Sequence, residues 1–309
     1  MQVIRGTRGA FGEPIALTIG NFDGVHLGHQ VMLARLRDAS HRLGLPATVL
    51  TFEPHPREFL SPDAAPARLT TMREKIACLA EFGVDRTQVI RFDRKFAAML
   101  PEDFVARLLV EKLCVRWLVV GDDYRYGAQR SGDYAHLAQA AARFGFQLEA
   151  VPSVNLAGER VSSTAVRAAL ARGDFAHAQR LLGRAYAITG RVVHGEKLGR
   201  RLGFPTANIA LKRMRAPLSG IYAVKLHGVD TLPLPAVASL GVRPTVMAHA
   251  APVLEVHVLD FHGDIYGRYV KVQFVGKLRD EEKYPDLETL RRQIERDVND
   301  ARHLLKSDA

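Results

Sequence analysis

The chain is poor in cysteine and has no long apolar run. Its 309 residues include two cysteines, Cys78 and Cys114, which lack the paired spacing of a metal-binding motif. No segment approaches the roughly 20 consecutive apolar residues of a membrane span, and the N-terminus lacks the apolar stretch of a signal peptide. These absences argue against a disulfide scaffold, a zinc ribbon and a membrane protein, so we expect a soluble, cytoplasmic protein.

The chain also lacks the usual marks of nucleic-acid binding. Its formal net charge is +10, but lysine and arginine are spread along the whole length. There is no basic tail and no basic stripe interleaved with aromatic residues. Ligands that carry phosphates explain the charge equally well, and we expect no nucleic-acid partner. The pattern GxxxxGK[ST] is absent too, which excludes a Walker-type kinase at the motif level.

The first half alternates segments typical of strands and helices, which predicts a parallel sheet with helices on its faces. Helices are expected over 28–44, 71–83, 101–114 and 134–145. Met32, Leu36, Ala39 and Leu43 form the expected apolar face of the first helix. Strands are expected over 14–20, 47–52, 87–92, 116–121 and 146–154.

The second half consists of short β-type runs separated by glycine, proline and aspartate turns. This spacing predicts an antiparallel barrel or sandwich, followed by a terminal helix over 286–305. The apolar stripe of that helix is expected at Leu287, Leu290, Ile294 and Val298. The change in pattern near residues 181–186 predicts two domains, 1–183 and 184–309.

A glycine-rich turn with two histidines follows the first expected strand, in "TIGNFDGVHLGHQ" (18–30). Gly20, Gly24 and Gly28 permit a tight turn and a close approach of the backbone to a ligand. A helix that begins near Gly28 directs N–H groups and the positive end of its dipole into the turn, which favours a polyphosphate. His26 and His29 can donate to oxygens that gain charge during attack at phosphorus. No third ligand with the HExxH spacing supports zinc, although a surface loop with incidental histidines fits the pattern as well.

A second polar motif, "VSSTAVR" (161–167), comes late in the first half. The hydroxyls of Ser162, Ser163 and Thr164 can cap the following helix and also contact phosphate. Arg167 lies one turn further on and can bind the same anion through two N–H groups. A plain helix cap is the simpler interpretation of this motif alone.

The H-x-G-H spacing of His26 and His29 resembles the signature of the nucleotidyltransferase superfamily. "GNFDGVHLGH", "FEPHP" (52–56), "GDDYRYG" (121–127) and "VSSTAVR", in this order, closely resemble the FMN adenylyltransferase module of bacterial bifunctional riboflavin kinase/FAD synthetases. The resemblance implies a Rossmann-like domain that transfers AMP from ATP to FMN, with magnesium, giving FAD and pyrophosphate. It implies catalytic roles for His26 and His29 and a triphosphate site at Ser162, Ser163, Thr164 and Arg167. It further implies ATP or FMN contacts from Gly20, Asn21, Phe22, Asp23, Gly28, His55, Asp123 and Arg125.

The second half opens with another glycine-rich basic stretch, "TGRVVHGEKLGRRLGFPTANI" (189–209). Within "PTAN", Thr206 and Asn208 offer oxygen ligands that suit a magnesium ion held mainly by substrate phosphates. In "VLEVHVLDF" (253–261), period-two alternation places Glu255 on the face opposite Val256. A carboxylate that faces a phosphate-binding loop can accept the proton of an attacking hydroxyl, whereas an outward glutamate on a half-buried strand is usually just solvated.

The ordered motifs of the second half resemble the riboflavin kinase module, a small antiparallel barrel with a C-terminal helix. The resemblance implies phosphorylation of riboflavin by ATP to give FMN, with Glu255 as the base and Thr206 and Asn208 at the metal. It also implies substrate contacts from Gly195, Lys197, Gly199, Arg200, Gly203, Pro205 and Arg243. One departure occurs in "SLGVRPT" (239–245), where Ser239 stands in place of the family's usual asparagine.

Three other functions remain open from the sequence. A regulator that binds flavin or nucleotide without catalysis is disfavoured by the intact His26, His29, Thr206, Asn208 and Glu255. An RNA-binding protein would show strongly salt-dependent binding. A nucleotidyltransferase with another acceptor, such as a phosphopantetheine or a pyridine nucleotide, leaves the kinase-like half unexplained. The oligomeric state is not determined by these patterns.

Overall fold

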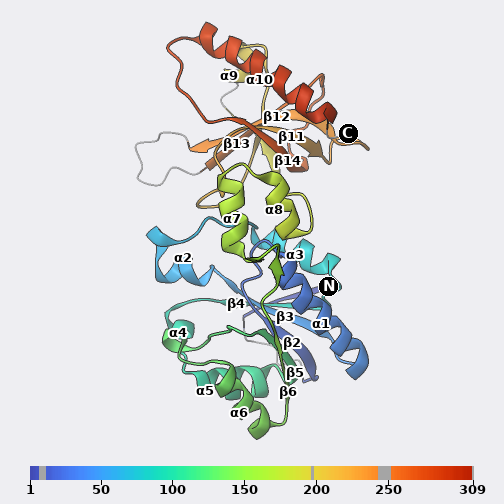
Figure 1. The fold of residues 1–309 in the computed structure, drawn as a ribbon, viewed down its shortest axis with the longest axis vertical. Helices are drawn as coiled ribbons and strands as arrows, with labels where there is room; N and C mark the ends of the chain where they lie inside the picture. The colour runs from blue at the N-terminus through green and yellow to red at the C-terminus, as the bar shows by residue number, and fades with distance from the viewer. Residues whose placement is uncertain (7–11, 196–197, 243–251, 308–309) are drawn as a thin grey trace. The chain divides into compact units, whose positions relative to one another are not determined.

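The computed structural model describes residues 1–6, 12–195, 198–242 and 252–307 (Figure 1). The chain divides into two compact units. The first comprises Met1–Pro66 and Met72–Ser162, and the second comprises Ala67–Thr71 together with the chain from Ser163 onward. Among the described residues, no helix is both long and apolar enough to cross a membrane.

A parallel sheet forms the centre of the first unit. Its six strands lie in the order β1-β4-β3-β2-β5-β6, and every neighbouring pair is parallel. The strands are β1 (Gln2–Arg5), β2 (Ile15–Ile19), β3 (Ala47–Glu53), β4 (Arg86–Arg91), β5 (Val115–Gly121) and β6 (Gln147–Val151). All five residues of β2 are buried, as expected for a central strand covered on both faces. The predicted parallel α/β sheet is confirmed.

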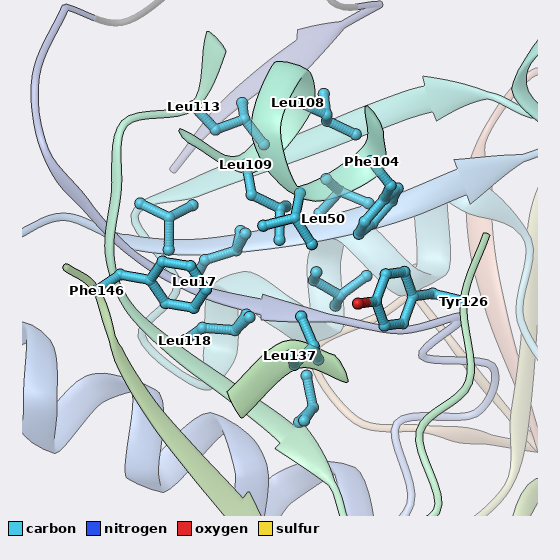
Figure 2. Close-up of a cluster of buried hydrophobic side chains, with 14 of the residues drawn as sticks. Leu17, Leu50, Phe104, Leu108, Leu109, Leu113, Leu118, Tyr126, Leu137 and Phe146 are labelled. Atoms are coloured by element: carbon cyan, nitrogen blue, oxygen red, sulfur yellow. The ribbon is translucent and has the colours of Figure 1, made fainter. Parts of the chain in front are cut away.

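Helices cover both faces of this sheet and enclose a separate apolar cluster on each. On one face, Leu33 and Leu36 of α1 (Leu27–Leu43) and Leu79 of α3 (Met72–Glu81) pack against the sheet. On the other face, a helical segment over residues 101–112 and α6 (Tyr134–Phe144) pack against alternate residues of β2 and β5 (Figure 2). The remaining elements of the unit are α2 (Pro56–Leu60), η1 (Pro62–Ala64), α4 (Arg94–Ala97), η3 (Ala128–Arg130), β7 (Asn155–Leu156) and β8 (Glu159–Arg160).

The strand order indicates where along the edge of the sheet a ligand would bind. From β2 the chain moves to β3 and β4 on one side, and later to β5 and β6 on the other. The order therefore reverses between β2 and β5, whose carboxyl ends lie side by side. Ligands of open parallel sheets bind at such a reversal. The turns after β2 and β5 contain two of the motifs identified in the sequence, "GNFDGVHLGH" and "GDDYRYG".

Three local features of the first unit differ from the sequence expectations. The edge strand β1 was not expected. On α1, Leu36 and Ala39 are buried as predicted, but Leu33 is buried where Met32 was expected, Met32 is only partly buried, and Leu43 is exposed. The expected helix over 101–114 consists of α5 (Pro101–Asp103) and a π-helix, η2 (Phe104–Lys112), in which the N–H of Leu113 donates to the carbonyl of Leu108 five residues back. Hydrophobic periodicity does not distinguish these hydrogen-bond patterns.

The second unit contains a closed antiparallel barrel, as predicted. Its strand order is β10-β13-β12-β11-β14-β9, and the pairing of β9 with β10 closes it. The strands are β9 (Ala187–Val193), β10 (Ala207–Ile209), β11 (Gly220–His227), β12 (Leu234–Val242), β13 (Pro252–Val258) and β14 (Tyr269–Arg279). The three-residue strand β10, which contains Asn208, was not expected as a strand.

Three longer helices belong to this unit, and two of them, α8 and α10, pack on the barrel. α7 (Ser163–Ala171) and α8 (Phe175–Leu182) pack on each other, and the Phe175 ring stacks on Phe274 of β14 at 5.9 Å. The terminal helix α10 (Leu287–Ser307) packs against β11, β12 and β14, mainly through Ala301 and Leu305. The expected stripe is therefore wrong at its first position, because Leu287 is 52% exposed. A short helix, α9 (Leu198–Arg201), completes the unit.

A buried ion pair attaches α10 to the barrel. The Arg279 guanidinium donates to both Asp297 oxygens at 2.8 and 2.7 Å, and the Asp297 side chain is only 5% exposed. Gln293 donates to the same carboxylate at 3.0 Å. The Asp297 carboxylate raises the pKa of Arg279 above its ordinary value.

Replacing Asp297 with alanine is expected to lower the free energy of unfolding of the second unit by about 3 kcal/mol, because it leaves a buried arginine without its partner. Urea unfolding followed by circular dichroism measures this change. Fluorescence of Trp117, the chain's single tryptophan, reports on the first unit and should be unaffected. Asp300→Ala, at an exposed position of the same helix, is the control. Equal effects of the two substitutions would contradict the prediction.

Candidate functional site

The turn after β2 is held in an unusual backbone conformation. Phe22, Gly24 and Val25 have φ values of 47°, 83° and 42°, in the left-handed region that ordinary side chains rarely occupy. Phe22 and Val25 are nonetheless completely buried, so apolar packing stabilises the conformation. Strained turns of this kind persist where the surrounding structure determines them, and they cluster at functional sites.

The two histidines stack on each other at the start of α1. Their ring centroids are 3.7 Å apart and the planes differ by 21°. His26 caps the helix, because its Nδ1 accepts from the backbone N–H of His29 at 3.4 Å. A Cβ at Gly28 would lie 3.2 Å from the His26 ring, so glycine leaves room for the stack. The Phe22 ring packs against the His29 ring, with the two ring centroids 4.9 Å apart. The first turn of α1 contains no acidic residue, which leaves the positive end of the dipole uncompensated.

A cavity of about 870 Å³ opens at the same edge of the sheet. Its lining includes Gly20 and Asn21 after β2, His55 after β3, and Asp123 and Arg125 after β5. The structure therefore brings together five predicted site residues from three separate motifs. Phe22, Asp23, His26, Gly28 and His29 belong to the adjoining turn and helix start and do not line this cavity.

Aromatic residues form much of the cavity wall, and the sequence reasoning missed them. Those lining the cavity are Phe52, Phe92, Phe96, Phe104, Tyr124 and Tyr126. Several neighbouring rings meet edge-on or tilted, for example Phe52 and Phe92 at 6.0 Å and Phe104 and Tyr126 at 5.1 Å. A signal was present, because Phe52, Phe92 and Tyr124 stand at or just after the ends of three parallel strands. Such a wall suits a flat aromatic ligand.

Two predicted residues at this edge have local partners. His55 caps α2, with its Nδ1 accepting from the N–H of Arg57 at 3.2 Å. Asp123 pairs with Arg160 of β8 at 2.6 Å, and this carboxylate raises the pKa of Arg160 above its usual range. Arg160 was not singled out from the sequence, although it directly precedes the "VSSTAVR" motif.

The residues of "VSSTAVR" are divided between the units. Ser162 is the last residue of the first unit, whereas Ser163, Thr164 and Arg167 belong to α7 in the second unit. Within the second unit, Arg167 Nε donates to the carbonyl of Ala67 at 2.6 Å. The expected contact of these residues with a triphosphate stays a prediction.

In the second unit, a row of polar side chains crosses three strands of the barrel. Asn208 of β10 and Ser239 of β12 are both paired in register with Glu255 of β13. Residues directly opposite on neighbouring strands project from the same face. Thr206 donates through its hydroxyl to Glu255 Oε2 at 3.3 Å. The alternation predicted for β13 is confirmed, because Val256 is buried and Glu255 is partly exposed.

Two cavities in the second unit share the Thr206 side chain. The larger, about 440 Å³, includes Arg200, Pro205 and Thr206 in its lining. The other, about 320 Å³, includes Gly199, Asn208 and Glu255 in its lining, together with the apolar Leu290 and Ile294 of α10. Thr206 therefore stands where the two cavities meet, and the carboxylates of Glu255 and Asp297 line the second.

Glycines let the backbone of this region approach closely. A Cβ at Gly195 would lie 2.1 Å from the amide nitrogen of Asn208, and one at Gly199 would lie 2.4 Å from the Phe204 carbonyl. Gly203 has a φ of 91°. Two predicted contact residues, Lys197 and Arg243, lie outside the described residues. Ser239, where the family usually has asparagine, donates to Glu281 Oε1 at 3.4 Å.

Comparisons with known proteins cover both halves of the chain. A family model described as FAD synthetase matches residues 10–165, and one described as riboflavin kinase matches residues 182–305. The bifunctional riboflavin kinase/FMN adenylyltransferase of Escherichia coli (strain K12) is 48% identical over 98% of this chain and 97% of its own length. The protein of the same name from Pseudomonas fluorescens is 49% identical over 98% of both chains.

A solved structure is similar over nearly the whole chain. It is described as a macrolide-efflux protein from Streptococcus pneumoniae, with a TM-score of 0.82, 28% identity, and coverage of 98% of this chain and 99% of that one. The likeness extends across both the parallel-sheet unit and the barrel unit.

Proposed function

The chain belongs to the family of bifunctional riboflavin kinase/FMN adenylyltransferases, and from this premise we propose which residues carry out its two reactions. The protein phosphorylates riboflavin with ATP to give FMN, and it transfers AMP from a second ATP to FMN to give FAD and pyrophosphate. The family resemblance read from the motifs is confirmed. Assignment of the residues depends above all on the stacked histidines beside an aromatic cavity at the strand-order reversal.

In the adenylyltransferase, the isoalloxazine ring of FMN occupies the aromatic cavity. The FMN phosphate then lies toward Gly20 and Asn21, next to the start of α1. A phosphate oxygen of FMN attacks the α-phosphorus of ATP in line as pyrophosphate leaves, so no protein nucleophile is needed. The stacked His26 and His29 donate to the oxygens on which negative charge increases. Ser162, Ser163, Thr164 and Arg167 contact the triphosphate.

In the kinase, Glu255 accepts the proton of the riboflavin 5′-hydroxyl as that oxygen attacks the γ-phosphorus of ATP. Its carboxylate lines the smaller cavity, and the Thr206 hydroxyl holds one of its oxygens. Transfer of the phosphoryl group passes through a loose transition state, so the hydroxyl proton needs to be removed only late in the reaction. Arg200 and Pro205, which line the larger cavity beyond Thr206, contact ATP.

Magnesium fits the oxygen donors beside Glu255. The Thr206 hydroxyl and the Asn208 amide oxygen are the ligands we propose, and few protein ligands suit an ion held mainly by phosphates and water. The charge of the ion would neutralise the polyphosphate. Among the described residues, no cluster of three or more histidine, cysteine, aspartate or glutamate side chains forms an independent metal site.

We assign the adenylyltransferase to residues 1–183 and the kinase to residues 184–309. The two family-model matches, 10–165 and 182–305, support a functional boundary near residue 183. Nucleotide and flavin phosphates account for the net charge of +10 without a nucleic-acid partner, and the use of ATP in both reactions supports a cytoplasmic location. Strong, salt-dependent binding of an RNA oligomer would contradict the proposal that the protein has no nucleic-acid partner.

Replacing Gly195 with alanine is expected to reduce the riboflavin kinase rate about tenfold or more. The added Cβ would meet the Asn208 amide at 2.1 Å and displace a proposed magnesium ligand. Conversion of supplied FMN to FAD by the same preparation is the internal control and should be unchanged. A kinase rate within twofold of wild type would show that the position of Asn208 is not required.

Incubation with riboflavin, ATP and Mg²⁺, followed by chromatography of the flavins, tests the two reactions and their metal. FMN should appear first and FAD should follow. Omitting Mg²⁺ and adding a chelator should stop both. Full activity with the chelator would contradict the metal proposal.

A further inference from the structure

Tyr126 joins the aromatic cavity to the interior of the first unit. Its ring lines the cavity and is only 5% exposed, and Figure 2 shows it beside Phe104 at the edge of a buried apolar cluster. Its hydroxyl is hydrogen bonded to Nδ1 of His136, on the first turn of α6. Burial raises the pKa of this phenol above its ordinary value, so the hydroxyl stays protonated and can donate.

Neighbouring groups restrict where the Tyr126 ring can lie. Backbone hydrogen bonds of 3.0 Å in both directions join Tyr126 to Gly132. A Cβ at Gly132 would come within 2.7 Å of the Tyr126 ring, so the glycine backbone lies directly against it. Tyr124 stacks nearly parallel at 5.6 Å. The hydroxyl bond to His136 then holds the far end of the ring in place.

His136 is itself held from two sides. Its backbone N–H donates to Asp133 Oδ1 at 3.0 Å, which caps α6. Its Nε2 lies 3.4 Å from Glu102 Oε1. A proton on Nε2 faces this carboxylate, and the neutral ring then presents Nδ1 as the acceptor for the Tyr126 hydroxyl. Glu102 thus favours the tautomer in which Nδ1 accepts from the Tyr126 hydroxyl.

We propose that His136 is a positioning residue for FMN adenylylation, acting through the Tyr126 hydroxyl to fix the aromatic wall on which the flavin packs. His136 is not among the residues that line the aromatic cavity, so it acts without touching the flavin. The proposal rests on the proposed function, in which the isoalloxazine ring occupies that cavity. A wall fixed before binding lowers the ordering cost of the complex, so loss of the contact weakens FMN binding more than it slows the chemical step.

Steady-state kinetics of FAD formation from supplied FMN test this proposal. His136→Leu should raise KM for FMN about five- to tenfold, because the Tyr126 ring must then be ordered when FMN binds, with kcat within twofold. His136→Asn places a polar atom where Nδ1 lies and should stay within twofold of wild type. Tyr126→Phe should raise KM, and adding His136→Leu to Tyr126→Phe should change KM less than twofold further. The riboflavin kinase rate of each variant is the control for intact protein.

The possible failures are distinguishable. If Tyr126→Leu leaves KM for FMN unchanged, the flavin does not occupy this cavity, and the proposed function and the inference both fail there. If Tyr126→Leu raises KM but His136→Leu does not, only the role of His136 is overturned. An equal effect of His136→Leu with and without the Tyr126 hydroxyl would also overturn it. Should His136→Leu fail to fold, the Tyr126→Phe and His136→Asn variants test the inference instead. The inference fails if Tyr126→Phe leaves KM for FMN unchanged. It also fails if His136→Asn raises KM for FMN.

Discussion

Replacing His29 with alanine is expected to slow FAD formation by a factor of about 10² to 10³, the usual effect of removing one donor to a transition-state oxygen. FMN formation from riboflavin should continue at the wild-type rate, so FMN accumulates. The proposed reason is the position of the ring at the start of α1, stacked on His26 at 3.7 Å, where the helix dipole and both imidazoles would act on the same oxygens. Chromatography of the flavins formed from riboflavin and ATP measures both rates at once.

Two further variants separate the chemical role of the histidine pair from its structural role. His26→Asn keeps a side-chain acceptor for the helix cap but removes the imidazole, so it should lose FAD formation without loss of stability. His41→Ala changes an exposed histidine in the last turn of the same helix and should have no effect. An FAD rate in His29→Ala within a few-fold of wild type would contradict the assignment of this pair.

Replacing Glu255 with glutamine should reduce riboflavin phosphorylation by a factor of about 10² to 10⁴, the range associated with loss of a general base. The amide keeps the shape of the side chain and can still accept from Thr206, but it cannot take a proton from the attacking hydroxyl. Supplied FMN should be converted to FAD at the normal rate. Separate assays with riboflavin and with FMN, each with ATP and Mg²⁺, measure the two effects.

Glu288→Gln makes the same chemical change at an exposed position of α10. Among the residues that the structure describes, the Glu288 carboxylate pairs with Arg291 and Arg292, through surface contacts of little energetic value. Its kinase rate should match the wild type. If Glu255→Gln lost both activities equally, the two sites would not operate independently. If it lost neither, another group must accept the proton.

Much of the candidate sites could be predicted because short motifs carry local geometry. The glycines around His26 and His29 require a tight turn before a helix, and the alternation around Glu255 assigns it to the face opposite Val256. The covering helices were less predictable. In α1 the buried face includes Leu33 rather than Met32, since contact with the sheet, and not the helical period, selects among adjacent apolar residues.

Residues that become neighbours only in three dimensions escaped the sequence. The aromatic wall joins Phe52, Phe92, Phe104 and Tyr126, whose separations along the chain range from 12 to 40 residues between one and the next, and each taken alone is an ordinary core residue. Tyr126 and His136 meet because the backbone bridge to Gly132 folds the intervening segment back. The short strand β10 is defined by its partners β9 and β13, which place Asn208 beside Glu255.

The sequence by itself therefore determined the two fold classes, the family and the motif residues that are proposed for each site, because periodicity and motif spacing act over a few residues. The tertiary structure decided which groups share a cavity. Strand order brings the ends of β2, β3 and β5 to one edge, and barrel register aligns Asn208, Glu255 and Ser239. Both depend on pairing between distant segments, and local patterns contain no record of that pairing.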